Sequence, residues 1–421
     1  MSNNFKYKKD FNNINEDFLV ELQDLKELKN WRLTNSLNLI HKSRSFFTFI
    51  GVKDQLNNFL ISQNEVGILA IFCKNNSKDF FEQFFLLQNK FEPGNQPFTQ
   101  LSPAIQMTYS NLKGKHGGEN NNLNFIDNLS KNLYFSTLQL EQSDSFLHKK
   151  NLNYFALLEN EEIPAFMQKS DLFWISTSEI IQFALKGEIL HADSRSVLFF
   201  VFFDKFYKID GNPGKSRSLN QLFSFFSLSA FKFQKPWRFT SMENICEYKE
   251  GKIYLNDNKQ SFDKRHILGV KVSSKTREVK SWEQPLLSVE SKAFLLIISK
   301  KANDIYILVS LGIGPGLFTE FEILPSFVFK SSENIEINEL IKFKELKELH
   351  TSWQTEEGGR FFKRRNLHKI FLSNSMDIFN QENNLFWLNL NEFFNISNNT
   401  NFISMELRSI GFLLFSYLLR K

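Results

Sequence analysis

Residues 352–372 read SWQTEEGGRFFKRRNLHKIFL and hold two glutamates, two glycines and four cations within ten positions. Residues 139–152, QLEQSDSFLHKKNL, are a diverged copy at a constant spacing of 215 residues (356 − 141). Five aligned positions are identical, pairing Gln139, Glu141, Phe146, Asn151 and Leu152 with Gln354, Glu356, Phe361, Asn366 and Leu367. The cations Lys149 and Lys150 align with Arg364 and Arg365. A repeated block of this kind predicts an internal duplication of the fold.

Two longer blocks extend the repeat in the same order. Residues 170–198 align without a gap with 383–411, and residues 56–72 align with 282–298. The stretch GNPGKSRSLNQ between the copies is rich in Gly, Pro, Ser and Asn, which favour turns and loops. The repeat therefore predicts an N-terminal extension (1–21), a first unit (22–205), a linker (206–236) and a second unit (237–421).

Each unit is predicted to mix strands and helices, which places the chain in the α+β class. GILAIFCK (67–74) and AFLLIISK (293–300) are apolar runs of strand length, and VLFFVFF (197–203) is predicted to be a further buried strand. Ser176 with Glu179, and Asn389 with Glu392, have the spacing of a helix N-cap and its third residue. The same helix is therefore expected to begin at the aligned position of both units.

Composition indicates a globular protein without a nucleic-acid partner. The formal net charge is only +5 over 421 residues, whereas a nucleic-acid interface needs a dense basic face. Cys73 and Cys246 form neither a disulfide framework nor a metal-ligand set, which suits a reducing compartment. Residues 1–18 lack the apolar core of a signal peptide, and the apolar runs are too short to span a bilayer. We therefore expect a cytoplasmic protein with no membrane partner.

Motifs for metals and redox cofactors are missing from the sequence. The seven histidines show no HxH or HExxH spacing, and nothing matches a zinc-ligand set. There is no glycine-rich dinucleotide fingerprint and no serine nucleophile elbow. We therefore expect no metal and no cofactor.

Two groups of polar residues are site candidates, and each has two interpretations. KGKHGG (113–118) places His116 beside Gly117 and Gly118, where the backbone can approach a ligand closely or simply form a surface loop. The charged residues of 356–365 are either a solvated strand face or a phosphate-binding group, for which arginine is suited. A carboxylate and two cations survive in both copies, which argues in part against the solvated strand face and leaves both interpretations open.

Motifs along nearly the whole chain resemble the NDP-hexose 2,3-dehydratases of deoxysugar biosynthesis. The first half carries LSPAIQMTYSN (101–111), HGG (116–118), LEQSDSFLHKKN (140–151) and ADSRSVL (192–198). The second half carries REVKSWEQPLL (277–287), QTEEGGRFFKRRN (354–366) and MELRS (405–409). Among the departures, Val328 in the second copy stands opposite Gln106 in the first.

The resemblance implies two fused Nudix-like units, a homodimer and no cofactor. The implied substrate is a TDP-linked 4-keto-6-deoxyhexose, which loses water across C2 and C3. A base removes the C3 hydrogen that the C4 ketone makes acidic, and an acid protonates the departing C2 hydroxyl. The product, a 3,4-diketo-2,6-dideoxy sugar nucleotide, would pass to a downstream 3-ketoreductase. The alternatives are a Nudix-type nucleotide-sugar diphosphate hydrolase and a non-catalytic nucleotide-sugar-binding protein.

Under this resemblance, His116, Glu141 and Glu356 are the candidates for base and acid. Trp282 either stacks on the nucleotide base or is a buried structural residue, and Arg195 and Arg408 either bind diphosphate or are paired core cations. The other candidate substrate-binding residues are Gly117, Gly118, Lys149, Lys150, Gln354, Gly358, Gly359, Arg360, Arg364, Arg365 and Asn366.

Overall fold

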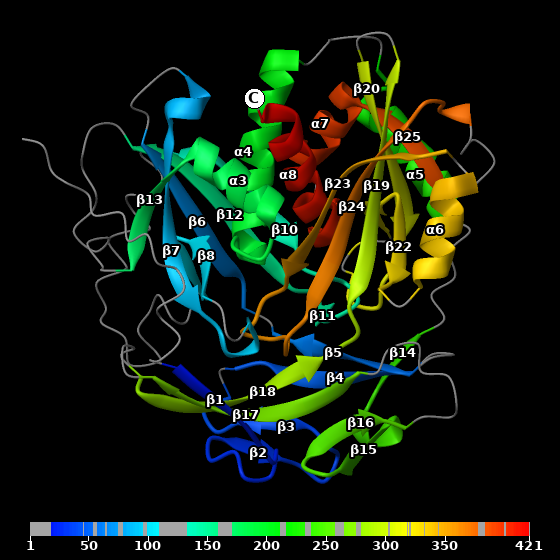
Figure 1. The fold of residues 1–421 in the computed structure, drawn as a ribbon. Helices are drawn as coiled ribbons and strands as arrows, with labels where there is room; N and C mark the ends of the chain where they lie inside the picture. Colours follow the sequence, from blue (N-terminus) through cyan, green and yellow to red (C-terminus); the bar gives the residue numbers. More distant parts are fainter. Residues whose placement is uncertain are drawn as a thin grey trace, which may run out of the picture.

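The computed structural model shows two seven-stranded sheets with helices between them and smaller sheets across one end (Figure 1). It describes residues 18–420, apart from 45, 54–56, 64, 75–78, 96–98, 109–132, 159–170, 211–215, 232–236, 257–264, 275–278, 302–303, 318, 320, 332, 344, 378–383 and 400.

The described elements of the first half, in chain order, are β1 (Phe18–Gln23), β2 (Trp31–Leu33), β3 (Leu39–His41), β4 (Thr48–Lys53), β5 (Asn58–Ser62), β6 (Gly67–Lys74), β7 (Phe84–Phe91), β8 (Thr99–Pro103), β9 (Ile105–Thr108), β10 (Leu133–Leu140), β11 (Phe146–Leu147), β12 (Lys150–Leu158), β13 (Leu172–Ser176), α3 (Thr177–Lys186), α4 (Ala192–Asp210) and α5 (Leu219–Ala230). Those of the second half are β14 (Arg238–Thr240), β15 (Cys246–Lys249), β16 (Lys252–Leu255), β17 (His266–Ser274), β18 (Ser281–Ser288), β19 (Lys292–Lys301), β20 (Asp304–Gly312), β21 (Glu322–Pro325), β22 (Phe327–Lys330), α6 (Asn334–Phe343), β23 (Lys347–Thr355), β24 (Arg365–Ser373), β25 (Leu385–Asn389), α7 (Leu390–Asn399) and α8 (Met405–Leu419).

The two large sheets have the same order of strands. The first runs β10-β12-β6-β7-β13, with β8 beside β7 and β9 beside β6. The second runs β23-β24-β19-β20-β25, with β21 beside β20 and β22 beside β19. In each sheet the β12–β6 or β24–β19 pair is parallel, and the other described pairs are antiparallel. Each strand of the first sheet therefore has a counterpart with the same neighbours in the second.

The smaller sheets join segments from both halves of the chain. β1 pairs with β17 along its whole length, so residues 18–21 of the predicted extension belong to a sheet of the second half. β14, from the start of the second half, pairs with β4 of the first.

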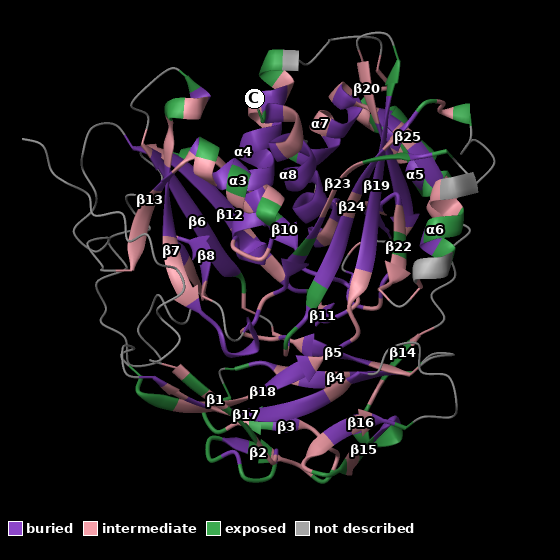
Figure 2. Ribbon diagram, in the orientation of Figure 1, coloured by how far each residue is buried: buried purple, intermediate pink, exposed green. Residues whose placement is uncertain are grey.

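The prediction of a strand at 197–203 is wrong, because these residues lie within helix α4. The run is buried throughout, and an apolar run alone does not separate a buried strand from a buried helix. Helix α8 packs beside α4, where Phe203 and Phe415 stack with ring centroids 4.4 Å apart. A Cβ at Gly411 would lie 2.6 Å from the Phe199 ring, so glycine permits this close approach. Figure 2 shows both helices buried between the sheets.

The predicted helix starts and the two predicted sheet strands are confirmed. The Glu179 amide donates to Ser176 Oγ at 3.3 Å, and the Ser176 amide donates to Glu179 Oε2 at 2.9 Å. Asn389 and Glu392 exchange the same two bonds at 2.8 and 3.2 Å before α7. Residues 67–74 form β6, and 293–300 lie in β19. The predicted unit boundary at 205 falls inside α4, and residues 219–230 of the predicted linker form α5.

Candidate active site

The turn that follows β23 (the second turn, residues 356–364) lies against the first half of the chain. The Gly94 amide donates to the Gly358 carbonyl at 2.8 Å, and the Lys363 amide donates to the Gly94 carbonyl at 2.7 Å. The Gly359 amide donates to Glu92 Oε2 at 2.9 Å. Gly358 and Gly359 therefore bring the backbone of the second half against the first half, where the Gly359 amide binds the Glu92 carboxylate.

The turn that follows β10 (the first turn, residues 141–149) lies in the same way against the second half. The Gly316 amide donates to the Ser143 carbonyl at 2.9 Å, and the His148 amide donates to the Gly316 carbonyl at 2.8 Å. Ser143 and His148 are the 215-residue counterparts of Gly358 and Lys363. The turn of each half thus packs against the other half, an arrangement that we call the exchange of turns.

The carboxylate and the asparagine preserved in both copies bind each other. Asn151 Nδ2 donates to Glu141 Oε1 at 2.6 Å, and Asn366 Nδ2 donates to Glu356 Oε1. Each asparagine also accepts a backbone amide, from Gly67 at 3.1 Å and from Lys292 at 2.8 Å respectively. The preserved asparagines therefore fix a carboxylate to the first residues of a neighbouring strand.

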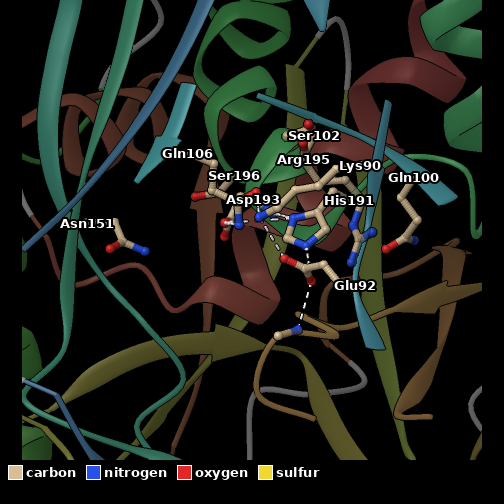
Figure 3. Close-up of polar contacts among 12 residues, drawn as sticks. Lys90, Glu92, Gln100, Ser102, Gln106, Asn151, His191, Asp193, Arg195 and Ser196 are labelled. Atoms are coloured by element: carbon tan, nitrogen blue, oxygen red, sulfur yellow. Dashed lines mark hydrogen bonds and ion pairs between the residues drawn. The ribbon is translucent and has the colours of Figure 1, made fainter. Parts of the chain in front are cut away.

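Five polar side chains meet beside the second turn (Figure 3), from β7 and the residue after it, from β9, and from the first turn of α4 and the residue before it: Lys90, Glu92, Gln106, His191 and Asp193. Glu92 binds Lys90 Nζ at 2.8 Å through Oε1 and His191 Nε2 at 2.9 Å through Oε2. Gln106 accepts from Lys90 Nζ at 2.6 Å and donates to Asp193 Oδ2 at 2.6 Å. Because the Asp193 amide donates to His191 Nδ1 at 3.1 Å, both ring nitrogens of His191 are engaged.

These five residues, together with Glu141, Lys149 and Glu357, form the first cluster. Burial is the main cause that raises the pKa of Glu141 to about 8. The charges of Asp193 and Glu357 contribute to this rise, and those of Arg408 and Lys149 oppose it. Burial is also the main cause of the raised pKa values of Asp193 and Glu357, and it lowers the pKa of Lys149. Burial acts to raise the pKa of Glu92 too, but Lys90 and His191 outweigh it and hold that pKa well below the ordinary value. The cluster therefore holds carboxyl groups that differ in protonation near neutral pH.

The second cluster contains Asp144, Lys292, Glu322, Arg364 and Glu406. Asp144 binds Lys292 and lies 3.5 Å from Arg364 Nη2; these cations hold its pKa well below the ordinary value although burial acts to raise it. Burial raises the pKa of Glu322 to about 8, and burial likewise raises that of Glu406. Glu322 Oε1 accepts from Ser143 of the first turn, whereas Glu322 Oε2 has no hydrogen-bond partner among the described residues.

Aligned positions show how the two clusters differ. Leu87 and Val309 pair with the equivalent residues Phe173 and Phe386, which sets the spacing of β7 and β20 at 222 residues (309 − 87). Asp193 then corresponds to Glu406, so both clusters keep an acid at the start of the long helix. Five other members of the first cluster have no chemical equivalent: Lys90, Glu92, Gln106, His191 and Glu357 correspond to Gly312, Gly314, Val328, Ser404 and Gln142.

Arg195 and Arg408 are buried, and the structure favours their interpretation as paired core cations. Arg195 donates to Ser409 Oγ on α8, and Arg408 donates to Ser196 Oγ on α4. The other guanidinium nitrogens of both residues donate to backbone carbonyls. These groups connect the halves of the chain and are not available to a diphosphate.

The other predicted cations lie in three different environments. Arg364 is buried in the second cluster, and Arg365 is exposed and pairs with Glu188 at 3.0 Å. Arg360 is half-buried in the second turn, where its guanidinium carbon lies 4.3 Å from the centre of the Phe47 ring. Arg360 Nε has no hydrogen-bond partner among the described residues.

The remaining predicted site residues are distributed around these turns. Trp282 on β18 donates from Nε1 to Gln284 Oε1 at 3.0 Å and packs beside the cluster around Phe91. Gln354 is buried and donates to the Ala184 carbonyl at 3.1 Å. Lys150 is half-buried at the start of β12. His116, Gly117 and Gly118 lie outside the described residues.

Sequence reasoning missed Lys90, Glu92, Gln106, His191 and Asp193 as members of the site, and it placed Glu357 only within the charged group of 356–365. Asp193 was inside a quoted motif, and its signal is an acid directly before the long apolar run of 197–203. His191 and Glu92 leave a signal only in the comparison of the copies, because each stands where the other copy has a small residue.

Buried carboxyl groups of different protonation beside a lysine and a histidine are typical of an enzyme that transfers protons. The part of the chain that the structure describes contains no group of three or more His, Cys, Asp or Glu side chains able to hold a metal ion. Within that same part, no helix has both the length and the apolar character needed to cross a membrane.

The sequence profile of the NDP-hexose 2,3-dehydratases matches residues 6–201 and 246–414, and the chain belongs to this family. The prediction of an enzyme of this family is therefore confirmed.

Three curated relatives are each named dTDP-4-dehydro-6-deoxy-alpha-D-glucopyranose 2,3-dehydratase. The relative from Amycolatopsis orientalis is 28% identical over 327 residues, which are 73% of this chain and 66% of that protein. The relative from Saccharopolyspora spinosa is 24% identical over 424 residues, which are 91% of this chain and 85% of that protein. The relative from Streptomyces violaceoruber is 23% identical over 368 residues, or 78% of each chain.

Proposed function

We propose that this chain removes water across C2 and C3 of dTDP-4-keto-6-deoxyglucose. The substrate is taken from the names of the relatives. The structural observation that supports the proposal is the first cluster. Elimination next to a ketone needs a base for the C3 hydrogen and an acid for the C2 hydroxyl, and the ketone itself holds the electron pair. Buried carboxyls that cannot all ionise together supply both protonation states in one place.

Glu141 is assigned as the acid, because its pKa of about 8 keeps it protonated at pH 7. Glu357 is assigned as the base, because it is less buried than Glu141 or Asp193 and neighbouring Arg360 favours its ionised form. Glu357 takes the C3 proton, and Glu141 protonates the C2 oxygen as the C–O bond breaks and water leaves. The remaining enol then takes a proton at C2 and loses the proton of its C3 hydroxyl, which gives the 3,4-diketo-2,6-dideoxy sugar.

Two cations complete the assignment. Lys149 is buried beside Glu141 and Glu357 and is assigned to stabilise the enolate oxygen at C4. Arg360 is assigned to the diphosphate, because its side chain is half-exposed and its buried Nε lacks a partner among the described residues. Its Nη1 donates to the Gly359 carbonyl at 2.9 Å and its Nη2 to Gln63 Oε1 at 3.1 Å, so a diphosphate would replace or share these acceptors.

Catalysis is assigned to the first cluster because the second lacks the equivalent groups. Gln142 replaces the proposed base, and the residues that support Asp193 are replaced by Ser404, Gly314 and Val328. An amide has no proton-accepting role of this kind near neutral pH.

Several broader features are part of the same proposal. Two fused units that arose by duplication account for the equal strand order of the large sheets, and we expect each unit to be Nudix-like. A cytoplasmic location, a homodimer and a downstream 3-ketoreductase remain predictions from the sequence.

The test uses a matched pair of variants, Glu141→Gln and Glu356→Gln. Mass spectrometry of dTDP-4-keto-6-deoxyglucose incubations should show loss of one water with the wild type. Glu141→Gln should lower kcat by about 10²-fold or more, as for loss of an acid catalyst, whereas Glu356→Gln should retain most activity. Release of TMP and a sugar phosphate would identify a hydrolase instead. Inactivation by Glu356→Gln alone would instead assign the acid to Glu356, the counterpart of Glu141 that lies near Glu406 of the second cluster.

A further inference from the structure

Arg408 connects the second half of the chain to the residue directly before Glu141. From α8 its Nη2 donates to the Leu140 carbonyl at 2.8 Å, and its Nη1 donates to the Ile403 carbonyl at 2.6 Å. Its Nε donates to Ser196 Oγ on α4 at 2.8 Å. The side chain is 0% exposed, so these bonds form without competition from water.

Arg195 makes the corresponding contacts in the opposite direction. From α4 its Nη2 donates to the Thr355 carbonyl at 2.7 Å, directly before Glu356, and its Nη1 donates to the Leu190 carbonyl at 2.6 Å. Its Nε donates to Ser409 Oγ at 2.7 Å. The acceptors of the two arginines correspond at the repeat spacings of 215 (355 − 140) and 213 (403 − 190 and 409 − 196).

We propose that Arg408 is a positioning residue for the first cluster, which holds the Glu141 carboxyl in place from the opposite half of the chain. The inference rests on the proposed function of Glu141. All three guanidinium nitrogens of Arg408 donate, in diverging directions, and two of them also reach Gln139 Oε1 and Met405 Sδ. These bonds fix the Leu140 peptide relative to both long helices, and the Glu141 side chain leaves the chain at the next residue. The role is distinct from that of Arg195, whose long-range bond serves Glu356.

Charged groups from four elements surround Glu141. Asp193 belongs to α4, Glu357 to the second turn, Lys149 to the first turn and Arg408 to α8. The two anions favour the protonated carboxyl, and the two cations favour the ionised form. Loss of the Arg408 charge should therefore raise the pKa of Glu141 above its present value.

The experiment compares Arg408→Gln and Arg408→Lys with the control Arg195→Gln, which removes an equally buried arginine. Two quantities are measured: the pH dependence of kcat and KM, and the pH titration of the Glu141 carboxyl infrared band, identified by its loss in Glu141→Gln. Arg408→Gln should move the Glu141 inflection upward by roughly one pH unit or more in both measurements. Arg408→Lys keeps the charge but lacks the guanidinium fork, so it should leave the inflection in place and lower kcat by about tenfold at unchanged KM. Arg195→Gln should leave the inflection in place.

An unmoved inflection in Arg408→Gln, or an equal movement in Arg195→Gln, would overturn the inference. Should Arg408→Gln fail to fold, Arg408→Lys decides the matter, since a wild-type kcat in that variant contradicts positioning by the guanidinium. The infrared titration needs no turnover. It therefore still reports on Arg408 if Glu141 is not the acid, in which case Glu141→Gln remains active and only the proposed function fails.

Discussion

Glu92 and Glu322 are glutamates of equal burial, each 5% exposed, yet replacement by glutamine should change stability in opposite directions. At pH 7 Glu92 is ionised, and its carboxylate compensates Lys90 and accepts from His191 and the Gly359 amide. Glutamine has no charge, and its amide group would face these donors. Removal of one partner of a buried ion pair costs about 3 kcal/mol or more, so Glu92→Gln should lower the unfolding free energy by about this amount.

Glu322 has the opposite electrostatic state. Its pKa of about 8 keeps it protonated in the folded protein at pH 7, whereas in the unfolded chain the pKa is near the ordinary value of 4.5. A raised carboxyl pKa contributes stability that is fully present below the unfolded value and is lost as pH rises toward the folded value. The interval from 4.5 to 7, at about 1.4 kcal/mol per pH unit, gives a loss of about 3 to 4 kcal/mol. Glutamine does not ionise and still accepts from Ser143, so Glu322→Gln should stabilise the protein by up to about 3 kcal/mol at pH 7.

The aligned position of the first half supports this substitution, because Gln100 occupies it at the spacing of 222 residues (322 − 100). The assay is equilibrium urea unfolding followed by tryptophan fluorescence, with the wild type and both variants at pH 7 and pH 5. The gain from Glu322→Gln should shrink to within about 1 kcal/mol at pH 5. The reasoning would be refuted if Glu322→Gln destabilised the protein at pH 7, or if Glu92→Gln cost less than about 1 kcal/mol.

Two further predictions, on the second turn and on the first residue of β24, are tested by thermal unfolding. A Cβ at Gly358 would lie 2.6 Å from Asn95 Cγ and 2.8 Å from Asn95 N, so Gly358→Ala should cost about 2 kcal/mol or more. The nearest atom to a Cβ at Gly359 is 3.5 Å away, so Gly359→Ala should cost less than about 1 kcal/mol; equal losses would contradict this packing. Arg365 and Glu188 form an exposed pair at 3.0 Å, and Arg365→Ala should change stability by less than about 1 kcal/mol, a larger loss arguing for a structural role.

The repeat pattern predicted local structure well where a local signal exists. The capped helix starts and strands β6 and β19 follow from side-chain spacing and apolar runs, which act within a few residues. Helix α4 was missed because its run is apolar on every side, so it lacks the period that separates a helix from a strand. The exchange of turns between halves is set by contacts such as Gly94 with Gly358, which no local pattern encodes.

For the site, residues that are identical in both copies identified the structural framework that the two turns share. They did not identify the residues that make the first cluster chemically different from the second. Glu141 with Asn151 and Glu356 with Asn366 were selected because both copies need them to orient the turns. Preservation also selected Arg195 and Arg408, for a structural reason. A residue that gives one copy a separate chemistry, such as Glu92, is by definition not preserved in the other.

The asymmetry of the glycines in EEGGRF follows from the exchange of turns. Glu92 and Gly314 are counterparts, and so are Gly358 and Ser143. Glu92 lies against the second turn, where a Cβ at Gly358 would overlap Asn95 and where the Gly359 amide reaches the carboxylate. The first turn instead carries Ser143, and a Cβ at Gly314 would lie 2.2 Å from Ser143 Oγ. At each turn, then, a residue with a side chain on one half faces glycine on the other: Glu92 faces the glycines of the second turn, and Ser143 faces Gly314. The glycines of the second turn therefore allow the first half to keep Glu92, and Gly314 excludes that carboxylate from the second half.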